Sequence, residues 1–529
     1  MASTLEFKVR RREAVLVGPA GPTPHEFKKL SDLDDQMGLR FQIPVLQFYR
    51  NNGSMAGKDP AKVIKEALAK ALVHYYPFAG RMREEPGMKL GVECTGEGVL
   101  FIEADADVTI DQFGDGIWPP FKCLDDILYD VPGTGDVVNC PLMLIQVTRL
   151  ACGGFIVAYR HNHTMADAAG LVQFMTAVSE FARGAAQPSQ QPVWARELLF
   201  ARDPPRVTCE HREYDEVPDT KNTLVPHPDM VDRSFFFGPR QLAQIRKHLP
   251  AQLHKASTFE IITALIWRAR TISLKIDPED TVRILSIVSG RSKINPPLPS
   301  GYYGNVFVLP AAVSTAHDLY TGQLGYAVGL VKRAKEKVTE EYIRSTADLL
   351  VLRGKTHATA VGTFLVSDVT HAGFREVDFG WGEALYGGPA KSGVGPLPGF
   401  ATFYISYRNR DGEDGVVVPM CMPRPAMERF SAQFDKFTLR RKEAVLVGPA
   451  RPTPHEFKKL SDLDDQMGLR FQIPALQFYR YNRSMAGKDP AKVIKEALAK
   501  ALVHYYPLAP GANEMVHAMG SFKEFVMDM

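Results

Sequence analysis

One stretch of this sequence combines residue types that can carry out acid–base chemistry. Residues 155–170 begin as an apolar run and continue into a helical pattern, so His163 is predicted to lie at a strand-to-helix turn. Near a helix N-terminus the backbone dipole disfavours imidazolium, which keeps a histidine neutral and ready to accept a proton near pH 7. Such a base supplies about 10²–10⁴-fold in rate by deprotonating a hydroxyl as it attacks a carbonyl carbon. We therefore expect His163 to act as a general base.

Structural explanations compete with this interpretation. Thr164 and Asp167 fit a capping box, with Thr164 as N-cap and Asp167 at N3, which would give both residues a purely structural role. His161 and His163 could face one way on a strand and bind a metal, but no third Cys, Asp or Glu stands at ligand spacing. The six cysteines contain no C-x-x-C pair, which indicates reduced thiols. No metal site is expected.

The elements that position this stretch belong to a chain of 529 residues, long enough for two or more domains. A content of 45% hydrophobic and 23% charged residues is typical of a globular protein. The formal net charge is only +3, which gives no basic footprint for nucleic acid or for an anionic membrane surface. The sequence has no apolar run of about 18 residues and no apolar signal core at its start, so a cytoplasmic protein is expected.

Residues 186–230 separate two parts of the chain. This segment is polar and rich in proline and has neither helical nor alternating periodicity, so it is predicted to be a crossover linker. On each side, strand-like runs such as 142–147 and 402–407 are separated by helical patterns, which favours α/β or α+β domains over an all-helical protein. The predicted domains are residues 1–185 and 231–437.

The beginning of the chain returns near its end. Residues 13–79 recur at 443–509, and nothing similar to residues 81–430 follows, so residues 438–529 are a truncated duplicate of residues 8–79 with an unmatched tail. The two copies differ at Gly21/Arg451, Val45/Ala475, Asn51/Tyr481, Gly53/Arg483 and Phe78/Leu508. Each copy predicts strands followed by a helix, which in the first copy begins after Asp59 as N-cap. The second copy must dock elsewhere, exchange with the first within or between chains, or stay partly disordered.

Several motifs resemble those of the BAHD acyltransferases, a plant family of acyl-CoA-dependent enzymes. Residues 163–167, His-Thr-Met-Ala-Asp, resemble the family's H-x-x-x-D motif, and residues 378–382 match its second signature, D-F-G-W-G. Residues 75–81 and 301–305 are similar to its Y-P-x-A-G-R and G-Y-F-G-N segments. Ala168 replaces a common glycine, which narrows the resemblance toward alcohol acyltransferases of the benzyl alcohol benzoyltransferase type.

The resemblance implies a fold and a reaction. Members of the family have two similar-sized domains like that of chloramphenicol acetyltransferase, with mixed sheets, around a channel that acyl-CoA and the acceptor enter from opposite sides. The implied reaction is direct acyl transfer from acyl-CoA, as co-substrate, to the hydroxyl of a small alcohol of the benzyl or fatty alcohol type. His163 would be the base, and Asp167 would orient the motif loop through an ion pair with Arg291.

The resemblance also assigns supporting residues. Ser367, eleven residues before Asp378, is the candidate oxyanion donor, although Val369 replaces the tryptophan that the family has nearby. Asp378 and Trp381 look structural, and core packing is favoured over ligand contact for Trp381. The candidates for the CoA channel are Ser257, Thr258, Lys293 and Trp381. Ser257 and Thr258 could equally be ordinary N-caps.

Alternatives to an alcohol acyltransferase stay open. The acceptor could be an amine or polyamine, or the duplicate at 438–529 could leave a non-catalytic homologue. A monomer is expected, with a dimer swapped through residues 438–529 as the alternative. The acyl donor and the acceptor depend on pocket shape, which one sequence does not reveal.

Overall fold

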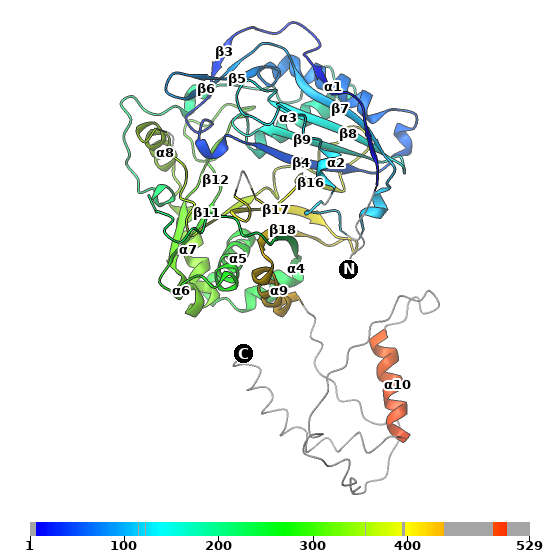
Figure 1. The fold of residues 1–529 in the computed structure, drawn as a ribbon, viewed down its shortest axis with the longest axis vertical. Coiled ribbons are helices and arrows are strands. Elements are labelled where there is room, and N and C mark those ends of the chain that lie inside the picture. The colour runs from blue at the N-terminus through cyan, green and yellow to red at the C-terminus, as the bar shows by residue number, and fades with distance from the viewer. Residues whose placement is uncertain are drawn as a thin grey trace. The chain divides into compact units, whose positions relative to one another are not determined.

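The computed structural model describes residues 7–114, 116–121, 123–354, 356–393, 397–438 and 490–504. The chain divides into a unit of residues 1–438 and a second unit of residues 439–529. The first unit contains two large mixed sheets with helices packed on them (Figure 1), which is the mixed α/β fold expected from the sequence. No helix in the described part of the chain is long and apolar enough to cross a membrane.

The N-terminal sheet has seven strands. Only β7 and β8 run parallel among its paired neighbours. Helices α1 (Pro60–His74) and α3 (Ala168–Ala182) pack against each other and contribute to the core of this sheet. In order across the sheet the strands are β1 (Val9–Arg11), β7 (Val99–Ala106), β8 (Met143–Leu150), β9 (Phe155–Asn162), β4 (Gln42–Tyr49) and β16 (Tyr386–Pro389), and β2 (Val15–Val17) also pairs with β7. A small sheet of β3 (Phe27–Lys29), β6 (Lys89–Glu93) and β5 (Arg81–Glu85) and the short helix α2 (Leu124–Ile127) complete this part.

The C-terminal sheet has six strands. Its central pairs, β11 with β15 and β15 with β17, are parallel, and its outer pairs are antiparallel. In order the strands are β10 (Met230–Phe237), β18 (Asp414–Pro423), β17 (Ala401–Arg408), β15 (Thr363–Asp368), β11 (Thr281–Ser286) and β14 (Ala311–Thr315), and β12 (Val288–Ser289) pairs separately with β13 (Phe307–Val308). The helices of this part are α4 (Pro239–Lys247), α5 (Thr258–Leu274), α6 (Ala316–Thr321), α7 (Leu324–Glu336), α8 (Glu340–Leu352) and α9 (Arg424–Thr438).

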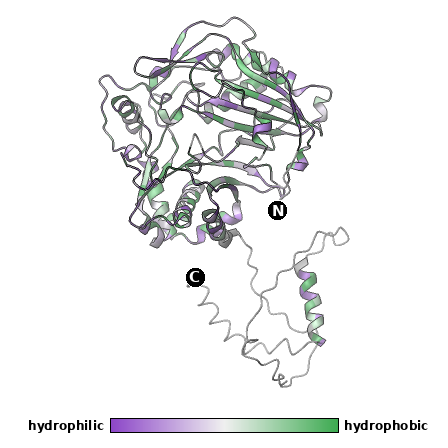
Figure 2. Ribbon diagram, in the orientation of Figure 1, coloured by the Kyte–Doolittle hydropathy of each residue, from purple (hydrophilic) through white to green (hydrophobic). Residues whose placement is uncertain are grey.

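Each sheet buries apolar side chains against its helices, and Figure 2 shows hydrophobic residues along the central strands of both. Helix α1 illustrates how the sequence specifies one of these layers. The Asp59 side chain accepts a hydrogen bond from the Ala61 N–H, and Pro60 occupies the first turn, as predicted. Ile64, Leu68 and Leu72 then recur on one face and are fully buried.

One strand connects the two parts of the first unit. Strand β16 lies far along the chain, within the predicted domain 231–437, yet it pairs with β4 of the N-terminal sheet over Tyr386–Phe48 to Pro389–Val45. The predicted boundaries at 185, 230 and 437 stay predictions. The C-terminal part of the sequence therefore supplies an edge strand, β16, to the N-terminal sheet.

The second unit is described only at helix α10 (Pro490–His504). Its fifteen residues are identical to those of α1. In α1, Ile64 and Leu68 are buried and Val63 is half-buried, whereas Val493, Ile494 and Leu498 of α10 are 36%, 58% and 46% exposed. The other expectations for residues 438–529 lie outside the described residues.

Candidate active site

His163 directly follows β9 and lies in the turn before α3, which confirms the strand-to-helix turn predicted from the sequence. Its backbone N–H donates to the Phe41 carbonyl oxygen at 3.0 Å. The half-buried imidazole lies between Phe41 and Phe307, whose ring centroids are 5.3 and 6.2 Å from its own. Phe307 begins β13 and Phe41 precedes β4, so segments far apart in the sequence meet at this ring.

Asp167, and not Thr164, caps α3. The helix begins at Ala168, and Asp167 Oδ1 accepts from the Gly170 N–H at 2.9 Å. The Thr164 hydroxyl and N–H instead donate to Asn162 Oδ1 at 2.7 and 3.2 Å. The capping box with Thr164 as N-cap is therefore wrong, because the Asn162 side chain engages Thr164 in a local turn that competes with the start of a helix.

Asp167 joins the motif loop to the other part of the first unit. Arg291 Nη2 lies 2.8 and 3.0 Å from its two carboxylate oxygens, so the expected ion pair is present. The Val306 N–H also donates to Asp167 Oδ2 at 3.2 Å. Arg291 further donates to the carbonyl oxygens of Tyr302 and Gly304, at 2.7 and 2.8 Å. The carboxylate is thus fully engaged with protein groups.

A second, buried cluster holds the same loop and was not predicted from the sequence. Asp34 and Arg196 are both fully buried, and Arg196 Nη1 lies 3.1 Å from Asp34 Oδ1. Arg196 Nη2 donates to the Met165 carbonyl oxygen at 2.8 Å, inside the motif. Asn305 Nδ2 donates to the His163 carbonyl oxygen at 2.9 Å. A Cβ on Gly304 would stand 1.3 Å from Arg196 Nη1, so only glycine fits beside this guanidinium.

The sequence contains few signals from which this buried cluster could be predicted. Arg196 stands in the polar segment 186–230 that was interpreted as a linker, and Asp34 lies in a short acidic run. Asn305 ends the G-Y-F-G-N-like segment, which was the one available signal. Because a buried ion pair is stable only with good geometry and further hydrogen bonds, its members are recognisable only once the chain is folded.

The protonation of His163 follows from its surroundings. Burial lowers the pKa of His163, and its own backbone, Asp167, Asn305 and Asp34 partly offset this effect. The neutral imidazole predicted from the sequence is therefore favoured, but the main cause is burial and not the helix dipole. Within the described part of the chain, Nδ1 is buried without a hydrogen-bond partner. Nε2 is not among such buried atoms, so it is the more exposed of the two ring nitrogens.

His161 has a different environment. Its Nε2 lies 3.2 Å from the Ala166 carbonyl oxygen, to which the neutral ring donates. Burial lowers the pKa of His161 to about 3. Among the described residues, no group of three or more His, Cys, Asp and Glu side chains could hold a metal ion.

Ser367 lies near the end of β15. Side chains alternate along a strand, so Ser367 shares a face with Leu365. Leu365 is in one apolar cluster with Phe307, which contacts His163. Ser367 is 7% exposed, and its hydroxyl has no hydrogen-bond partner among the described residues. The role of Ser367 as oxyanion donor therefore stays a prediction.

The second signature forms a packed loop. Asp378 Oδ1 accepts from the N–H groups of Gly380 and Gly382, both at 2.7 Å. Phe379 is fully buried, and Trp381 is 6% exposed with its ring 5.1 Å from that of Phe155 in the N-terminal core. The structure therefore places Trp381 in the core, as the favoured interpretation expected.

The hydroxyl residues proposed for the CoA channel lie at a pocket of about 490 Å³. Ser257 caps α5 in a capping box with Glu260, so the alternative N-cap interpretation of Ser257 holds as well. The pocket is also lined by Thr258, Phe259, Asp368, Thr370, His371 and Ser406. Asp368 follows Ser367 directly, so its side chain faces the opposite side of β15 from the candidate oxyanion donor, which does not line this pocket. Lys293 is exposed, and it does not line this pocket.

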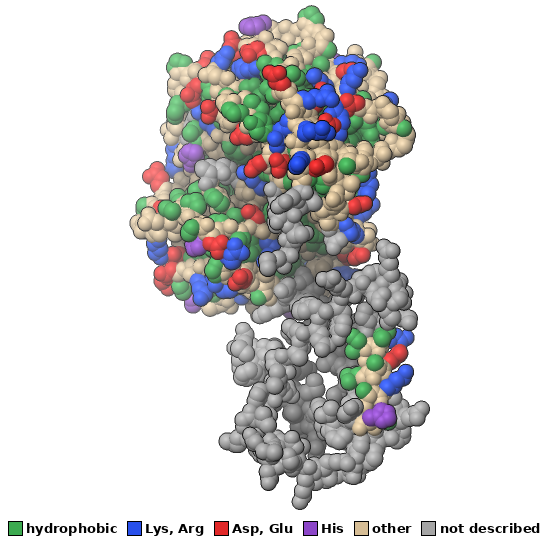
Figure 3. Space-filling model, turned by 45° about the vertical axis from the view of Figure 1, so that its right-hand side comes forward, with side chains coloured by type: hydrophobic (Ala, Val, Ile, Leu, Met, Phe, Trp, Pro, Cys, Tyr) green, Lys and Arg blue, Asp and Glu red, His purple; other side chains and the backbone are tan. Residues whose placement is uncertain are grey.

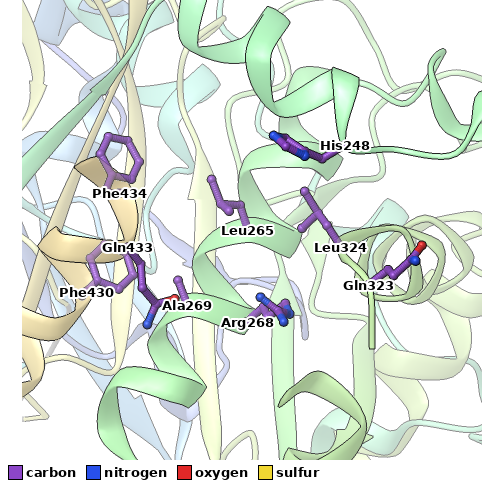
Figure 4. A pocket seen from close by; sticks show the side chains of 9 residues that line it. All are labelled: His248, Leu265, Arg268, Ala269, Gln323, Leu324, Phe430, Gln433 and Phe434. Carbon is purple, nitrogen blue, oxygen red and sulfur yellow. The ribbon is translucent and has the colours of Figure 1, made fainter. Parts of the chain in front are cut away.

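Another hollow lies on the helical layer of the C-terminal sheet. Leu265, Arg268 and Ala269 of α5 face Phe430 and Gln433 of α9 across it, with Leu324 opposite (Figure 4). Arg268 Nε and Nη2 donate to the carbonyl oxygens of Gly322 and Tyr320. Its lining shares no residue with the cluster around His163. On the face drawn in Figure 3, acidic and basic side chains of the first unit are intermixed, as the small net charge suggests.

Comparisons with known proteins agree on one family. The sequence profile of the Transferase family matches residues 7–437 and, a second time, residues 435–512. Benzyl alcohol O-benzoyltransferase of Petunia hybrida is 63% identical over 434 residues, covering 82% of this chain and 94% of the relative. Alcohol acyl transferase 1 (allele GSa) of Malus domestica is 51% identical over 444 residues, covering 83% and 95%. The crystal structure of vinorine synthase has a similar fold, with a TM-score of 0.65, 24% identity and coverage of 81% and 98%.

Proposed function

Because this chain belongs to the Transferase family, the BAHD acyltransferases, we propose that His163 is the base with which it acylates alcohols. The protein is an acyl-CoA-dependent O-acyltransferase that uses acyl-CoA as co-substrate and releases an ester and CoA. The observation that supports the role of His163 is its half-buried ring, with Nδ1 enclosed and Nε2 accessible, in a loop anchored from both parts of the first unit.

The proposed reaction needs no covalent enzyme intermediate, because a thioester is already activated. Nε2 of His163 takes the proton of the acceptor hydroxyl as its oxygen attacks the thioester carbonyl carbon. The Ser367 hydroxyl donates to the oxyanion that forms. When the carbon–sulfur bond breaks, the proton passes from His163 to the departing CoA sulfur, and the carbon–oxygen bond of the ester remains. Asp167 and Arg291 hold the loop without touching the substrate.

The acceptor is proposed to be a small apolar alcohol. The cluster on the site face of the C-terminal sheet contains Leu39, Leu285, Phe307, Leu309, Leu365 and Ala401. We propose that apolar side chains of this cluster contact the aromatic or aliphatic body of the acceptor, which would gain from burial of apolar area. We propose benzyl alcohol as acceptor and a benzoyl or short acyl group as donor, in line with the names of the Petunia and Malus relatives.

An amine or polyamine acceptor fits these surroundings less well. The carboxylates that act on the His163 ring are Asp167 and Asp34, and each is paired with an arginine. A cationic acceptor would need a carboxylate that is free to bind it, since a buried ammonium group is otherwise poorly solvated. Competition between benzyl alcohol and spermidine for benzoyl-CoA measures this preference directly.

The central experiment uses the purified full chain with benzoyl-CoA or acetyl-CoA and a panel of alcohols, with the ester separated by chromatography. Wild-type protein should form benzyl esters, and His163→Ala should lose about 10²–10⁴-fold in kcat. Cys152→Ala, which alters an exposed thiol, is the matched control and should retain the activity. If His163→Ala forms ester as fast as the wild type, His163 is not the base. If no ester forms with any alcohol, the chain is a non-catalytic homologue.

Residues 438–529 are proposed to be dispensable, and the enzyme is proposed to act as a cytoplasmic monomer. The first family match already spans residues 7–437. A chain ending at Phe437 should keep its kcat and sediment as a monomer in sedimentation-velocity ultracentrifugation. A truncated chain that does not fold, or a full chain that is a stable dimer only with its duplicate, would refute this proposal.

The CoA side is proposed to be the pocket at Ser257 and Thr258, with Lys293 near the phosphates. Replacement of Thr258 by Val should raise the KM for acyl-CoA several-fold and leave the KM for the alcohol unchanged. The same experiment with Lys293→Ala tests the exposed lysine, whose effect should weaken with added salt because its charge is screened.

A further inference from the structure

Asn305 lies between a buried carboxylate and the catalytic histidine. Its backbone N–H and its Nδ2 donate to Asp34 Oδ1 at 2.8 and 2.9 Å. The same Nδ2 donates to the His163 carbonyl oxygen at 2.9 Å. Asn305 is fully buried, so these contacts are shielded from water. The amide is therefore held at a fixed place beside His163.

The orientation of this amide is determined by its partners. Both acceptors of Nδ2, a carboxylate and a backbone carbonyl, can only accept hydrogen bonds. A flipped amide would place Oδ1 against two oxygen atoms, so Nδ2 must point toward Asp34 and the His163 carbonyl. Asp34 itself is fixed by Arg196 at 3.1 Å and by the Ser31 hydroxyl at 2.6 Å. Oδ1 is consequently directed away from this group of acceptors.

One polar atom of Asn305 and one of His163 are buried but make no hydrogen bond. Among the described residues, Asn305 Oδ1 and His163 Nδ1 are each buried without a hydrogen-bond partner. The Asn305 side chain nevertheless acts on the imidazole, and it favours the charged form, as an acceptor does. In a neutral imidazole, one nitrogen carries the proton and the other has a lone pair. The backbone of His163 acts in the same sense as Asn305, so the groups next to the ring suit a proton on Nδ1 better than a lone pair.

We infer that Asn305 is a positioning residue, which holds neutral His163 as the Nδ1–H tautomer and so leaves the lone pair on the accessible Nε2. The inference rests on the proposed role of His163 as the base. It explains why Nε2 is the basic nitrogen. The amide oxygen of Asn305 and the His163 carbonyl oxygen favour a proton on Nδ1, which leaves the lone pair on Nε2. The same oxygen stabilises the imidazolium that forms when Nε2 takes the acceptor proton, so the amide supports both states.

The tautomer can be measured without any substrate. The chain contains 14 histidines, so the His163 ring signals are assigned in the ¹⁵N-histidine spectrum by their absence in His163→Ala. At pH 8, the wild-type protein should show a protonated Nδ1 and an unprotonated Nε2 for His163. A wild-type spectrum with the proton on Nε2 overturns the inference, whatever the activity. The tautomer can be correct while His163→Ala stays active, in which case only the proposed function fails.

The variant Asn305→Leu removes the amide and keeps the volume. It should lower kcat about 10²-fold with a small change in KM, because part of the enzyme then holds the proton on Nε2. Since the amide raises the pKa of His163, its loss should also move the acid limb of kcat/KM to lower pH. The spectrum of the variant should show a mixture of tautomers. Asn305→Gln should restore part of both properties.

Thr164→Val is the matched control. Thr164 is fully buried in the same loop, and its hydroxyl donates to Asn162 Oδ1 and not to the imidazole. Its loss should lower the free energy of unfolding while the acid limb and the tautomer stay as in the wild type. If Asn305→Leu behaves like this control, Asn305 has only a structural role. If Asn305→Leu does not fold, the wild-type spectrum still decides the inference.

Discussion

Arg291 and Asp167 form a bridge between the two parts of the first unit, with Nη2 lying 2.8 and 3.0 Å from the two carboxylate oxygens. Asp167 is the N-cap of α3 in the N-terminal part, and Arg291 follows β12 in the C-terminal part. Because Asp167 ends the motif loop that begins at His163, the ion pair sets the position of His163 relative to the segment from which Phe307 contacts it. The contribution of the pair is therefore geometric.

Replacing Asp167 by Ala should destabilise the protein and slow the reaction. It removes an N-cap worth about 1 kcal/mol and hydrogen bonds to a charged group worth about 1.5–3 kcal/mol. We expect a loss of about 2–4 kcal/mol in the free energy of unfolding, measured with urea. Misplacement of His163 should lower kcat about 10²-fold.

The control for Asp167 is Asp229, which pairs with Arg424 at the surface. The side chains of Arg424 and Asp229 are 59% and 48% exposed, so Asp229→Ala should lose no more than about 1 kcal/mol. If both variants lose the same free energy of unfolding, the ion pair at Asp167 stabilises the protein no more than an exposed surface pair does.

The reaction should depend on pH through His163. Only the neutral ring can accept a proton, and burial lowers the pKa of His163 below its usual 6.5. The rate kcat/KM should therefore stay constant from pH 8 down past 6.5 and fall only at lower pH. A pH series with benzoyl-CoA and benzyl alcohol measures this limb. A midpoint above 6.5 would contradict the buried environment.

Acid stability should depend on His161. Burial lowers the pKa of His161 from 6.5 to about 3, so between these values the unfolded chain binds a proton that the folded protein does not. Stability therefore falls as pH drops from about 6.5 toward 3, and it is unaffected by this group above 6.5. His161→Gln should lose less stability than the wild type between pH 7 and pH 5 in urea titrations. Identical losses in both proteins would assign the acid sensitivity to other groups.

Ser367→Ala should lower kcat and leave both KM values nearly unchanged, because an oxyanion donor acts in the transition state. Loss of one such donor lowers kcat about 10²–10³-fold. The control is Thr402→Val on the neighbouring strand, where the buried hydroxyl donates to the Pro419 carbonyl oxygen. This control should lower stability but retain kcat. A Ser367→Ala enzyme with wild-type kcat would remove Ser367 from the mechanism.

The two copies of the duplicated segment should not be interchangeable. Val45 and Phe78 are fully buried, and Phe78 stacks on Phe174 with ring centroids 4.7 Å apart. The second copy has Ala475 and Leu508 at these positions. Introducing Val45→Ala and Phe78→Leu into the first copy should therefore lower the free energy of unfolding by about 2–4 kcal/mol.

A third difference between the copies supplies the control. Gly53 is exposed, and a Cβ added there would meet no atom within 4 Å. Gly53→Arg, the residue at 483, should change the free energy of unfolding by less than about 0.5 kcal/mol. If Val45→Ala and Phe78→Leu are equally neutral, the second copy could replace the first in the core.

Features that depend on neighbours along the chain were predictable from the sequence. The Asp59 cap of α1 and the strand-to-helix turn at His163 are set by hydrogen bonds and side-chain spacing within a few residues. The motif residues His163 and Asp167 were found in the same way, and the family resemblance added Arg291. Local rules fail where a nearby side chain competes, as Asn162 does for Thr164.

Only the tertiary structure revealed the contacts between distant segments. Asp34 meets Asn305 across 271 positions of sequence, and Arg196 reaches Met165 from a segment that looked like a linker. Strand β16 pairs with β4 rather than with its sequence neighbours. A charge or an amide can be buried only where its partners converge from several segments, and no local pattern encodes that convergence. The sequence therefore identified the proposed base, whereas folding determined which groups surround it.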